Sequence, residues 1–203
     1  MILVTHAPLA RSFFLRDTVS VARDLLGKTI IRNSREGMLR ARIVETEAYL
    51  SSGDEASHSA RGKTQRNASM FARGGTAYVY TIHARCCFNV VTEEADKGCA
   101  VLVRAVEPLS GVERMRALRG LCSDRDLTRG PARSCEALGI GLSWDGWDLT
   151  TGRRLWVCQG DSLSAVALGN SVRIGISRSQ ELLYRFFVKN NRFVSGPQRL
   201  NHV

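Results

Sequence analysis

Two glutamates separated by a single residue are the part of this sequence best suited to chemistry. Glu45 and Glu47 lie in the largely apolar run from Arg42 to Leu50, and residues two apart on a β-strand point to the same side. A carboxylate that is partly removed from water beside an aromatic ring such as that of Tyr49 can act as a general base. The alternative is that this face of the strand is solvated and the glutamates have no chemical role.

Aromatic and imidazole side chains follow the two glutamates along the chain. Tyr78 and Tyr80 alternate with an apolar residue and therefore share one face of a strand, and His83 comes shortly after them. These side chains could form a flat wall on which an aromatic base stacks, or simply the edge of a hydrophobic core. His58 lies in a polar loop between the two strands, where a histidine is most often an ordinary surface residue.

Arg104 interrupts a run from Ala100 to Val106 that is otherwise typical of a buried strand. Burying a guanidinium group is costly unless it is paired or hydrogen-bonded. One interpretation is a structural ion pair. The other is that Arg104 lies beside Glu47 and positions an anion or a water molecule there.

The charge of the chain favours a polyanionic partner without proving one. The formal net charge is +10, and 25 of the 29 basic residues are arginines. Arginine binds phosphate with two parallel hydrogen bonds, so a basic surface of this kind suits nucleic acid. A general compositional bias towards arginine would produce the same count.

Cysteine usage and the absence of long apolar runs narrow the class of protein. The six cysteines form no CxxC pair and no cysteine–histidine spacing typical of zinc, so we expect neither a metal nor another cofactor. No apolar run is long enough for a membrane span, and the first residues do not read as a secretory signal. We therefore expect an intracellular protein with reduced cysteines and no membrane association.

Periodicity and turn residues predict the elements that hold these side chains. Asp17 is a good N-cap for a helix that Gly27 would end, and Pro131 is typical of a first helical turn. Pro108 would end the strand that contains Arg104, and residues 51–75 form a long polar loop of the kind that is usually functional or disordered. We expect strands over residues 28–32, 39–50, 77–91, 100–106, 154–157, 172–176 and 184–188, and further helices over 112–119 and 132–138.

The chain is long enough for one sizeable core, and it shows no repeat and no interdomain linker. We therefore expect a single domain over residues 1–203. Residues 1–16 would form an N-terminal arm that packs onto the body through Pro8 and Phe13-Phe14. Residues 196–203 are polar and are expected to form a mobile tail.

Several of these motifs, in this order, resemble the alkyladenine (3-methyladenine) DNA glycosylase family of the AAG/MPG type. The resemblance is carried by Arg-Ile-Val-Glu-Thr-Glu-Ala-Tyr-Leu at 42–50, Asp-Glu-Ala-Ser-His-Ser at 54–59, Gly-Thr-Ala-Tyr-Val-Tyr at 75–80 and Val-Leu-Val-Arg-Ala-Val-Glu-Pro at 101–108. Leu-Thr-Arg-Gly-Pro at 127–131 and Val-Arg-Ile-Gly-Ile at 172–176 extend it over most of the chain. Separated motifs that agree in order are far more specific than one short motif.

The resemblance implies a fold and a reaction. The fold would be α+β, a single compact domain with a curved, mostly antiparallel sheet, surrounding helices and a protruding β-hairpin. The reaction would be base-excision repair: a damaged purine such as 3-methyladenine, 7-methylguanine or hypoxanthine is flipped out of duplex DNA, and its N-glycosidic bond is hydrolysed. No lysine except Lys63 lies within these motifs, so we expect a monofunctional glycosylase that leaves an abasic site. We further expect a monomer located with the DNA, in the cytoplasm and nucleoid of a bacterium or the nucleus of a eukaryote.

The resemblance also implies roles for individual residues. Glu47 would be the general base and Arg104 would help to hold the attacking water, with the backbone of residues 101–103 nearby. The flipped base would be bound by Tyr49, His58 and Tyr80, with Asn89 bordering the pocket. His83 would insert into the DNA stack where the family often has tyrosine, in a hairpin that is one residue shorter than usual.

Two other classes of protein remain open from the sequence. A non-catalytic DNA or RNA binder would keep the basic surface and the aromatic pocket but would not need Glu47 and Arg104. A hydrolase of free nucleosides would break the same bond but would not need the net charge or an inserting residue.

Overall fold

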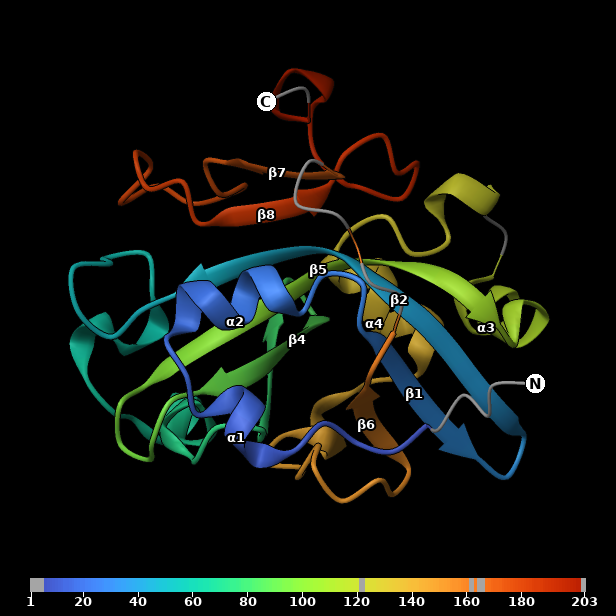
Figure 1. The fold of residues 1–203 in the computed structure, drawn as a ribbon, viewed down its shortest axis with the longest axis horizontal. Helices are drawn as coiled ribbons and strands as arrows, with labels where there is room; N and C mark the ends of the chain where they lie inside the picture. The colour runs from blue at the N-terminus through green and yellow to red at the C-terminus, as the bar shows by residue number, and fades with distance from the viewer. Residues whose placement is uncertain (1–5, 121–122, 161–162, 164–166, 202–203) are drawn as a thin grey trace.

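The long strand β2 (Gly37–Tyr49) is the element on which the sheet is built. One edge of β2 pairs with β5 (Cys99–Ser110). Its other edge is divided, because the first half pairs with β1 (Thr29–Ser34) and the second half pairs with β8 (Arg185–Val188). Register shifts between residues 43 and 46 of β2 mark the place where the partner changes, and bulges of this kind bend a strand. The sheet therefore curves around its middle (Figure 1).

The structure is a computed structural model that describes residues 6–120, 123–160, 163 and 167–201. Within them the strands form one eight-stranded antiparallel sheet, in the order β3-β4-β5-β2-β1-β6, with β8 added to β2 and β7 added to β8. The strands not yet given bounds are β3 (Ala77–Ile82), β4 (Arg85–Thr92), β6 (Leu155–Cys158) and β7 (Leu168–Ser171). The predicted α+β class and the single domain with a curved antiparallel sheet are confirmed.

The helices begin and end at the residues that local chemistry favours. Asp17 accepts a 2.8 Å hydrogen bond from the Ser20 backbone N–H and so caps α2. Pro131 occupies the first turn of α4, and Gly139 ends that helix in the left-handed conformation. The α-helices are α1 (Arg11–Phe14), α2 (Thr18–Asp24), α3 (Val112–Arg119) and α4 (Pro131–Leu138), and the short 3₁₀ helices are η1 (His58–Arg61), η2 (Gln65–Phe71), η3 (Asp124–Asp126), η4 (Leu142–Trp144) and η6 (Gln198–Leu200).

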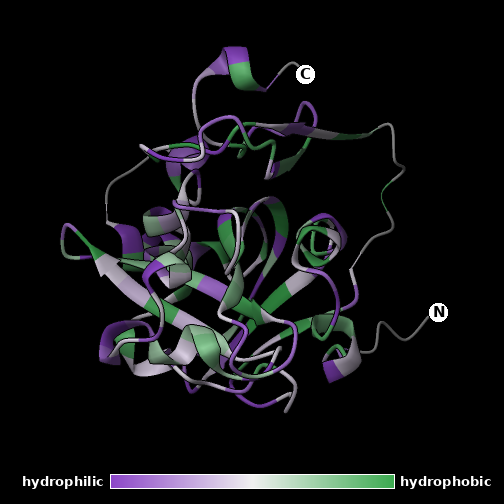
Figure 2. Ribbon diagram, turned by 90° about the vertical axis from the view of Figure 1, so that its left-hand side faces the viewer, coloured by the Kyte–Doolittle hydropathy of each residue, from purple (hydrophilic) through white to green (hydrophobic). Residues whose placement is uncertain are grey.

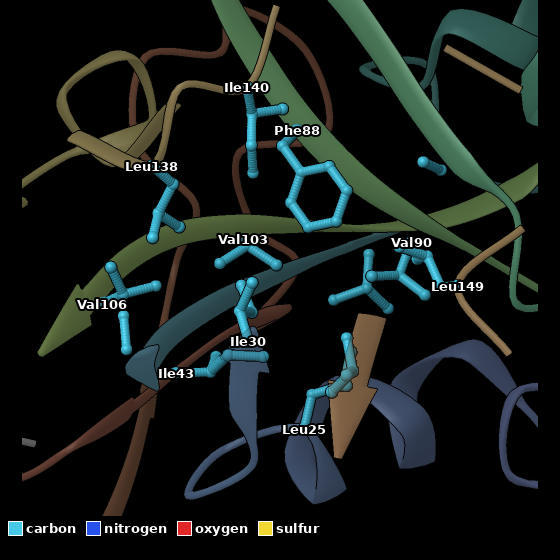
Figure 3. Packing of buried hydrophobic residues seen from close by; sticks show 14 of the residues in the cluster. Leu25, Ile30, Ile43, Phe88, Val90, Val103, Val106, Leu138, Ile140 and Leu149 are labelled. Carbon is cyan, nitrogen blue, oxygen red and sulfur yellow. The ribbon is translucent and has the colours of Figure 1, made fainter. Parts of the chain in front are cut away.

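The main hydrophobic core lies between the sheet and the helices that cover it. Side chains from β1, β2, β4 and β5 meet residues of α2, α4 and the loops after them, as Figure 3 shows for Ile30, Ile43 and Leu138. Thr46 ties α2 to the sheet because its hydroxyl donates a 2.8 Å hydrogen bond to the Ala22 carbonyl. In Figure 2 the hydrophobic segments gather in the central strands and the hydrophilic ones in the outer loops.

One predicted strand, residues 172–176, and one predicted strand end, at Pro108, are wrong. Residues 172–176 are not a strand, and the strand in this region is β7, which ends at Ser171. The apolar pattern there misleads because Arg173 and Ile174 leave the sheet to contact Asp54 and Glu47. Pro108 does not end its strand either, since β5 continues to Ser110. Pro108 pairs with β2 next to a register shift, a position where the missing N–H of proline is tolerated.

The two ends of the chain contact the body where they are described. Phe14 of the predicted arm is fully buried, and Pro8 forms an isolated bridge with Cys158. In the predicted tail, Asn201 accepts a 2.7 Å hydrogen bond from Arg185. Residues 1–5 and 202–203 lie outside the described residues, and the mobility of the tail stays a prediction. No helix in the described part of the chain is both long enough and apolar enough to cross a membrane.

Candidate active site

Glu47 is fully buried and forms three hydrogen bonds. Its Oε1 accepts from the Ile174 backbone N–H at 2.8 Å. Its Oε2 accepts from the Tyr49 hydroxyl at 2.9 Å and from Arg104 Nη1 at 3.1 Å. The alternative of a solvated strand face is therefore wrong, since neither Glu45 nor Glu47 has exposed surface.

Arg104 joins the two glutamates. Its Nε donates to Glu45 Oε1 at 3.3 Å while Nη1 binds Glu47. Burial alone would lower the pKa of Arg104, but the carboxylates of Glu47 and Glu45 outweigh that effect and raise it above its usual value. The interpretation of Arg104 as a structural ion pair is confirmed. Arg104 also lines a cavity, and its positioning of an anion or a water molecule there stays a prediction.

A cavity of about 760 Å³ adjoins the Glu47–Arg104 pair, because Arg104 and Tyr49, which both bind Glu47, are among its lining residues. Its walls come from β2, the loop with η1, the β3–β4 hairpin, β5 and the segment after β7. The lining includes most of the residues singled out in the sequence: Tyr49, His58, Tyr78, Tyr80, Asn89 and Arg104. Glu47 lies behind the lining, where Tyr49 and Arg104 contact it. The volume is in the range of pockets that enclose a small organic molecule.

Three rings from two elements form one wall of the cavity. The rings of His58 and Tyr80 meet edge to face with centroids 4.5 Å apart, and Tyr78 and Tyr80 lie 5.5 Å apart. Nδ1 of His58 shares a 2.8 Å hydrogen bond with the Tyr78 hydroxyl. Alternation along β3 places both tyrosines on this face, and η1 carries His58 towards them. The aromatic pattern therefore forms a cavity wall rather than only a core edge.

Desolvation sets the protonation states of this wall. It lowers the pKa of His58, helped by the nearby charge of Arg66, so the imidazole is neutral at pH 7. It also raises the pKa of Tyr78 to about 12 and raises the pKa of Tyr80 further. For Tyr49, burial comes first and the Glu47 carboxylate adds to it, so the pKa of that hydroxyl is also raised. The tyrosines are thus hydrogen-bond donors at neutral pH.

Asn89 and His83 lie at different depths in the hairpin. Asn89 is buried in β4, and its amide nitrogen donates to the Tyr78 carbonyl at 3.0 Å. His83 is exposed at the hairpin turn, outside the cavity lining, with φ of 47°, and Ala84 follows with φ of 61°. Ile82 beside it lines the mouth of the cavity and remains 53% exposed. The cavity thus gathers every predicted site residue except Glu47, which lies just behind it, and His83.

Ile174 is the site residue that sequence reasoning missed. Its N–H binds Glu47, and its carbonyl lies 3.5 Å from Arg104 Nη1. The backbone of residues 101–103, which the family resemblance places near Glu47, does lie beside it, because Leu102 is paired with Glu47 in the sheet. An apolar side chain gives no signal of a role that belongs to its backbone. Only the Arg-Ile-Gly motif around it pointed to this segment.

Among the described residues, no three histidine, cysteine or acidic side chains lie close enough together to hold a metal ion. The five described cysteines are free thiols, and Cys122 lies outside the described residues. The groups present at this site are a carboxylate, a guanidinium group, aromatic rings and backbone groups.

The chain is similar to known proteins over most of its length. The family model for methylpurine-DNA glycosylase (MPG) matches residues 12–192. A protein of Mesorhizobium japonicum is 46% identical over 196 residues, covering 96% of this chain and 93% of its own length. Similar proteins of Carboxydothermus hydrogenoformans and Rhodopirellula baltica are 44% and 47% identical, covering 92% and 94% of this chain and 98% and 84% of their own lengths. All three are provisionally named 3-methyladenine DNA glycosylase.

Proposed function

Because the chain belongs to the methylpurine-DNA glycosylase family, we propose that it excises alkylated purines from DNA by hydrolysing the N-glycosidic bond, as a 3-methyladenine DNA glycosylase in base-excision repair. The observation that carries this proposal is the buried Glu47–Arg104 pair beside an aromatic cavity, with Arg104 in the cavity lining and Glu47 behind it. It supplies a proton acceptor and a charged donor next to a space that suits a purine. We extend the substrates to 7-methylguanine and the deaminated base hypoxanthine.

Glu47 is the general base in this proposal. Among the described residues, the Ile174 N–H is the one donor to its Oε1, and a carboxylate oxygen can accept a second hydrogen bond. A water molecule held there and by Arg104 would pass a proton to the carboxylate while its oxygen bonds to the sugar C1′. The bond from C1′ to the purine nitrogen breaks, and its electron pair leaves with the base. A cationic alkylated purine leaves as the neutral base, whereas hypoxanthine leaves as an anion that takes up a proton from the solvent, and Glu47 then returns its own proton to the solvent. The products are a free purine and an abasic site, and no covalent enzyme intermediate is needed.

Tyr49, His58 and Tyr80 bind the flipped base. A purine between their rings replaces the stacking that it loses in the duplex. With His58 neutral, donation from the Tyr78 hydroxyl to Nδ1 leaves a proton on Nε2. That N–H is then available to a purine acceptor. Asn89 borders the pocket with its amide nitrogen committed to the Tyr78 carbonyl, so its orientation is fixed, and it disfavours the 2-amino group of normal guanine. 7-Methylguanine carries the same group, but its positive charge makes it a much better leaving group.

His83 is the residue that enters the DNA stack. Its position at an exposed hairpin turn beside the cavity mouth supports this role, since an inserted side chain offsets the stacking lost when a nucleotide is flipped. The net charge of +10 supplies the attraction to phosphate. We further propose that the enzyme acts as a monomer on damaged duplex DNA inside the cell.

The experiment that tests this function compares three substrates of the wild-type protein. A duplex with one hypoxanthine, the matching duplex with guanine, and free inosine are incubated at equal concentration, and released base is measured. Release from the lesion duplex alone is expected. Binding of the lesion duplex without release would support a non-catalytic binder, and equal release from inosine would support a nucleoside hydrolase.

A further inference from the structure

A buried cation lies against one ring of the cavity. The Arg173 side chain has no exposed surface, and its guanidinium carbon lies 4.6 Å from the centroid of the Tyr49 ring. The group is held by hydrogen bonds to Asp54 at 2.7 and 2.6 Å and to the Ala48 carbonyl at 2.9 Å. The distance is well within the range of a cation–π interaction.

Arg173 occupies one face of the Tyr49 ring. Tyr49 lines the cavity and Arg173 does not. A base that stacks on this ring must therefore use the opposite face. The Tyr49 hydroxyl is bound to Glu47 at 2.9 Å, so the ring is fixed at its edge as well as on its rear face.

A cation on one face changes what the other face attracts. An aromatic ring binds cations through the negative charge above both faces. A guanidinium group at the rear draws that density towards itself and repels a second positive charge through the ring. A neutral purine loses little of its stacking by this, whereas a purine that carries a positive charge from alkylation loses part of its cation–π attraction.

Asp54 moderates the effect without cancelling it. Its carboxylate is fixed by the Leu50 and Ala56 backbone N–H groups at 3.1 and 3.2 Å as well as by Arg173. The guanidinium group lies over the Tyr49 ring, 4.6 Å from its centroid. The positive end of the pair is therefore the end nearer the base.

We propose that Arg173 is a specificity-determining residue that acts through Tyr49 and shifts the preference of the cavity from cationic towards neutral damaged purines. This inference rests on the proposed glycosylase function. The Arg173 guanidinium makes Tyr49 a poorer platform for 7-methylguanine, which carries a positive charge, than for neutral hypoxanthine. Cation recognition is then left to Tyr80 and His58 on the other wall.

The test measures the ratio of kcat/KM for 7-methylguanine to kcat/KM for hypoxanthine in the same duplex. The double variant Arg173→Gln/Asp54→Asn removes both charges of the buried pair together, so no unpaired charge is left behind. Its ratio is expected to rise about three- to tenfold over that of the wild type, the size of a moderate cation–π interaction. Arg173→Lys keeps the charge, and its ratio is expected to stay near the wild-type value.

If the double variant does not fold, the single variant Asp54→Asn tests the role of Arg173. Asp54→Asn alone leaves the Arg173 cation and removes its counter-charge. The ratio of kcat/KM for 7-methylguanine to kcat/KM for hypoxanthine should therefore fall below that of the wild type. A loss of packing would lower both rates together and leave the ratio unchanged. An unchanged ratio in the variants of an active enzyme overturns the role of Arg173 only, whereas a wild type that releases neither base overturns the proposed function itself.

Discussion

Arg185 donates a 2.7 Å hydrogen bond from Nε to Oε1 of Glu45, and neither side chain has any exposed surface. The same carboxylate oxygen accepts from Arg104, which in turn binds Glu47. Burial opposes the ionised form of Glu45, but Arg104 and Arg185 overcome it and lower the pKa of that carboxyl. Alternating charges thus run from the Glu47–Arg104 pair into the interior, where they meet the C-terminal segment at Ser195.

Removing Arg185 should therefore destabilise the whole domain. Arg185→Met leaves the buried Glu45 with one cation fewer and frees acceptors at Ser195 and Leu200. We expect a loss of about 3–5 kcal/mol in the free energy of unfolding, measured by urea denaturation. Arg73→Met is the matched control because its ion pair with Glu94 is mostly exposed, and it should cost at most about 1 kcal/mol. Similar losses in the two variants would contradict the account of a buried network.

Local signals in the sequence were sufficient for much of the fold. Asp17 as the cap of α2 and Pro131 in the first turn of α4 each act over a few residues, and each predicted its element. Alternation on β2 and β3 likewise placed Glu47 and the tyrosines on the correct faces. The residues with recognisable chemistry could be found because reactive groups are unusual on apolar strands.

Contacts between distant segments could not be read in the same way. The Glu47–Ile174 and Arg173–Asp54 hydrogen bonds join residues more than 100 positions apart. An apolar run at 172–176 looks like a strand until those partners are known. Arg185 carried no signal either, because one arginine among 25 gives no indication that it is fully buried.

The hairpin turn offers a test of DNA insertion. His83→Ala removes the side chain that fills the gap in the DNA stack, so affinity for lesion duplex should fall about tenfold or more, and further than it falls in Glu47→Gln. Ala84→Gly is the control, since glycine adopts the positive φ of that position without strain and His83 is kept. Equal affinity of His83→Ala and wild type, measured by fluorescence anisotropy, would exclude His83 as the inserted residue.

The His58–Tyr78 hydrogen bond predicts how excision depends on pH. Protonation of His58 would turn Nδ1 into a donor and disrupt its acceptance of the Tyr78 hydroxyl. Because the pKa of His58 is lowered from 6.5, the neutral form persists at pH 6.5 and is lost only as the pH falls further. Wild-type kcat/KM for hypoxanthine should therefore decline below that pH. His58→Gln should be less active at pH 7.5, and its kcat/KM should not show this part of the decline. A pH profile of His58→Gln identical in shape to that of the wild type would contradict the assignment of the decline to His58.

The role of Glu47 is the central claim, and one paired measurement tests it most directly. Single-turnover release of hypoxanthine from a duplex and affinity for that duplex are measured on the same preparations of wild type and Glu47→Gln. The amide keeps the shape of the side chain but cannot take a proton from water, so release should fall by about 10²–10⁴-fold while affinity changes little. Release by Glu47→Gln within about tenfold of the wild-type rate would contradict a general-base role for this carboxylate.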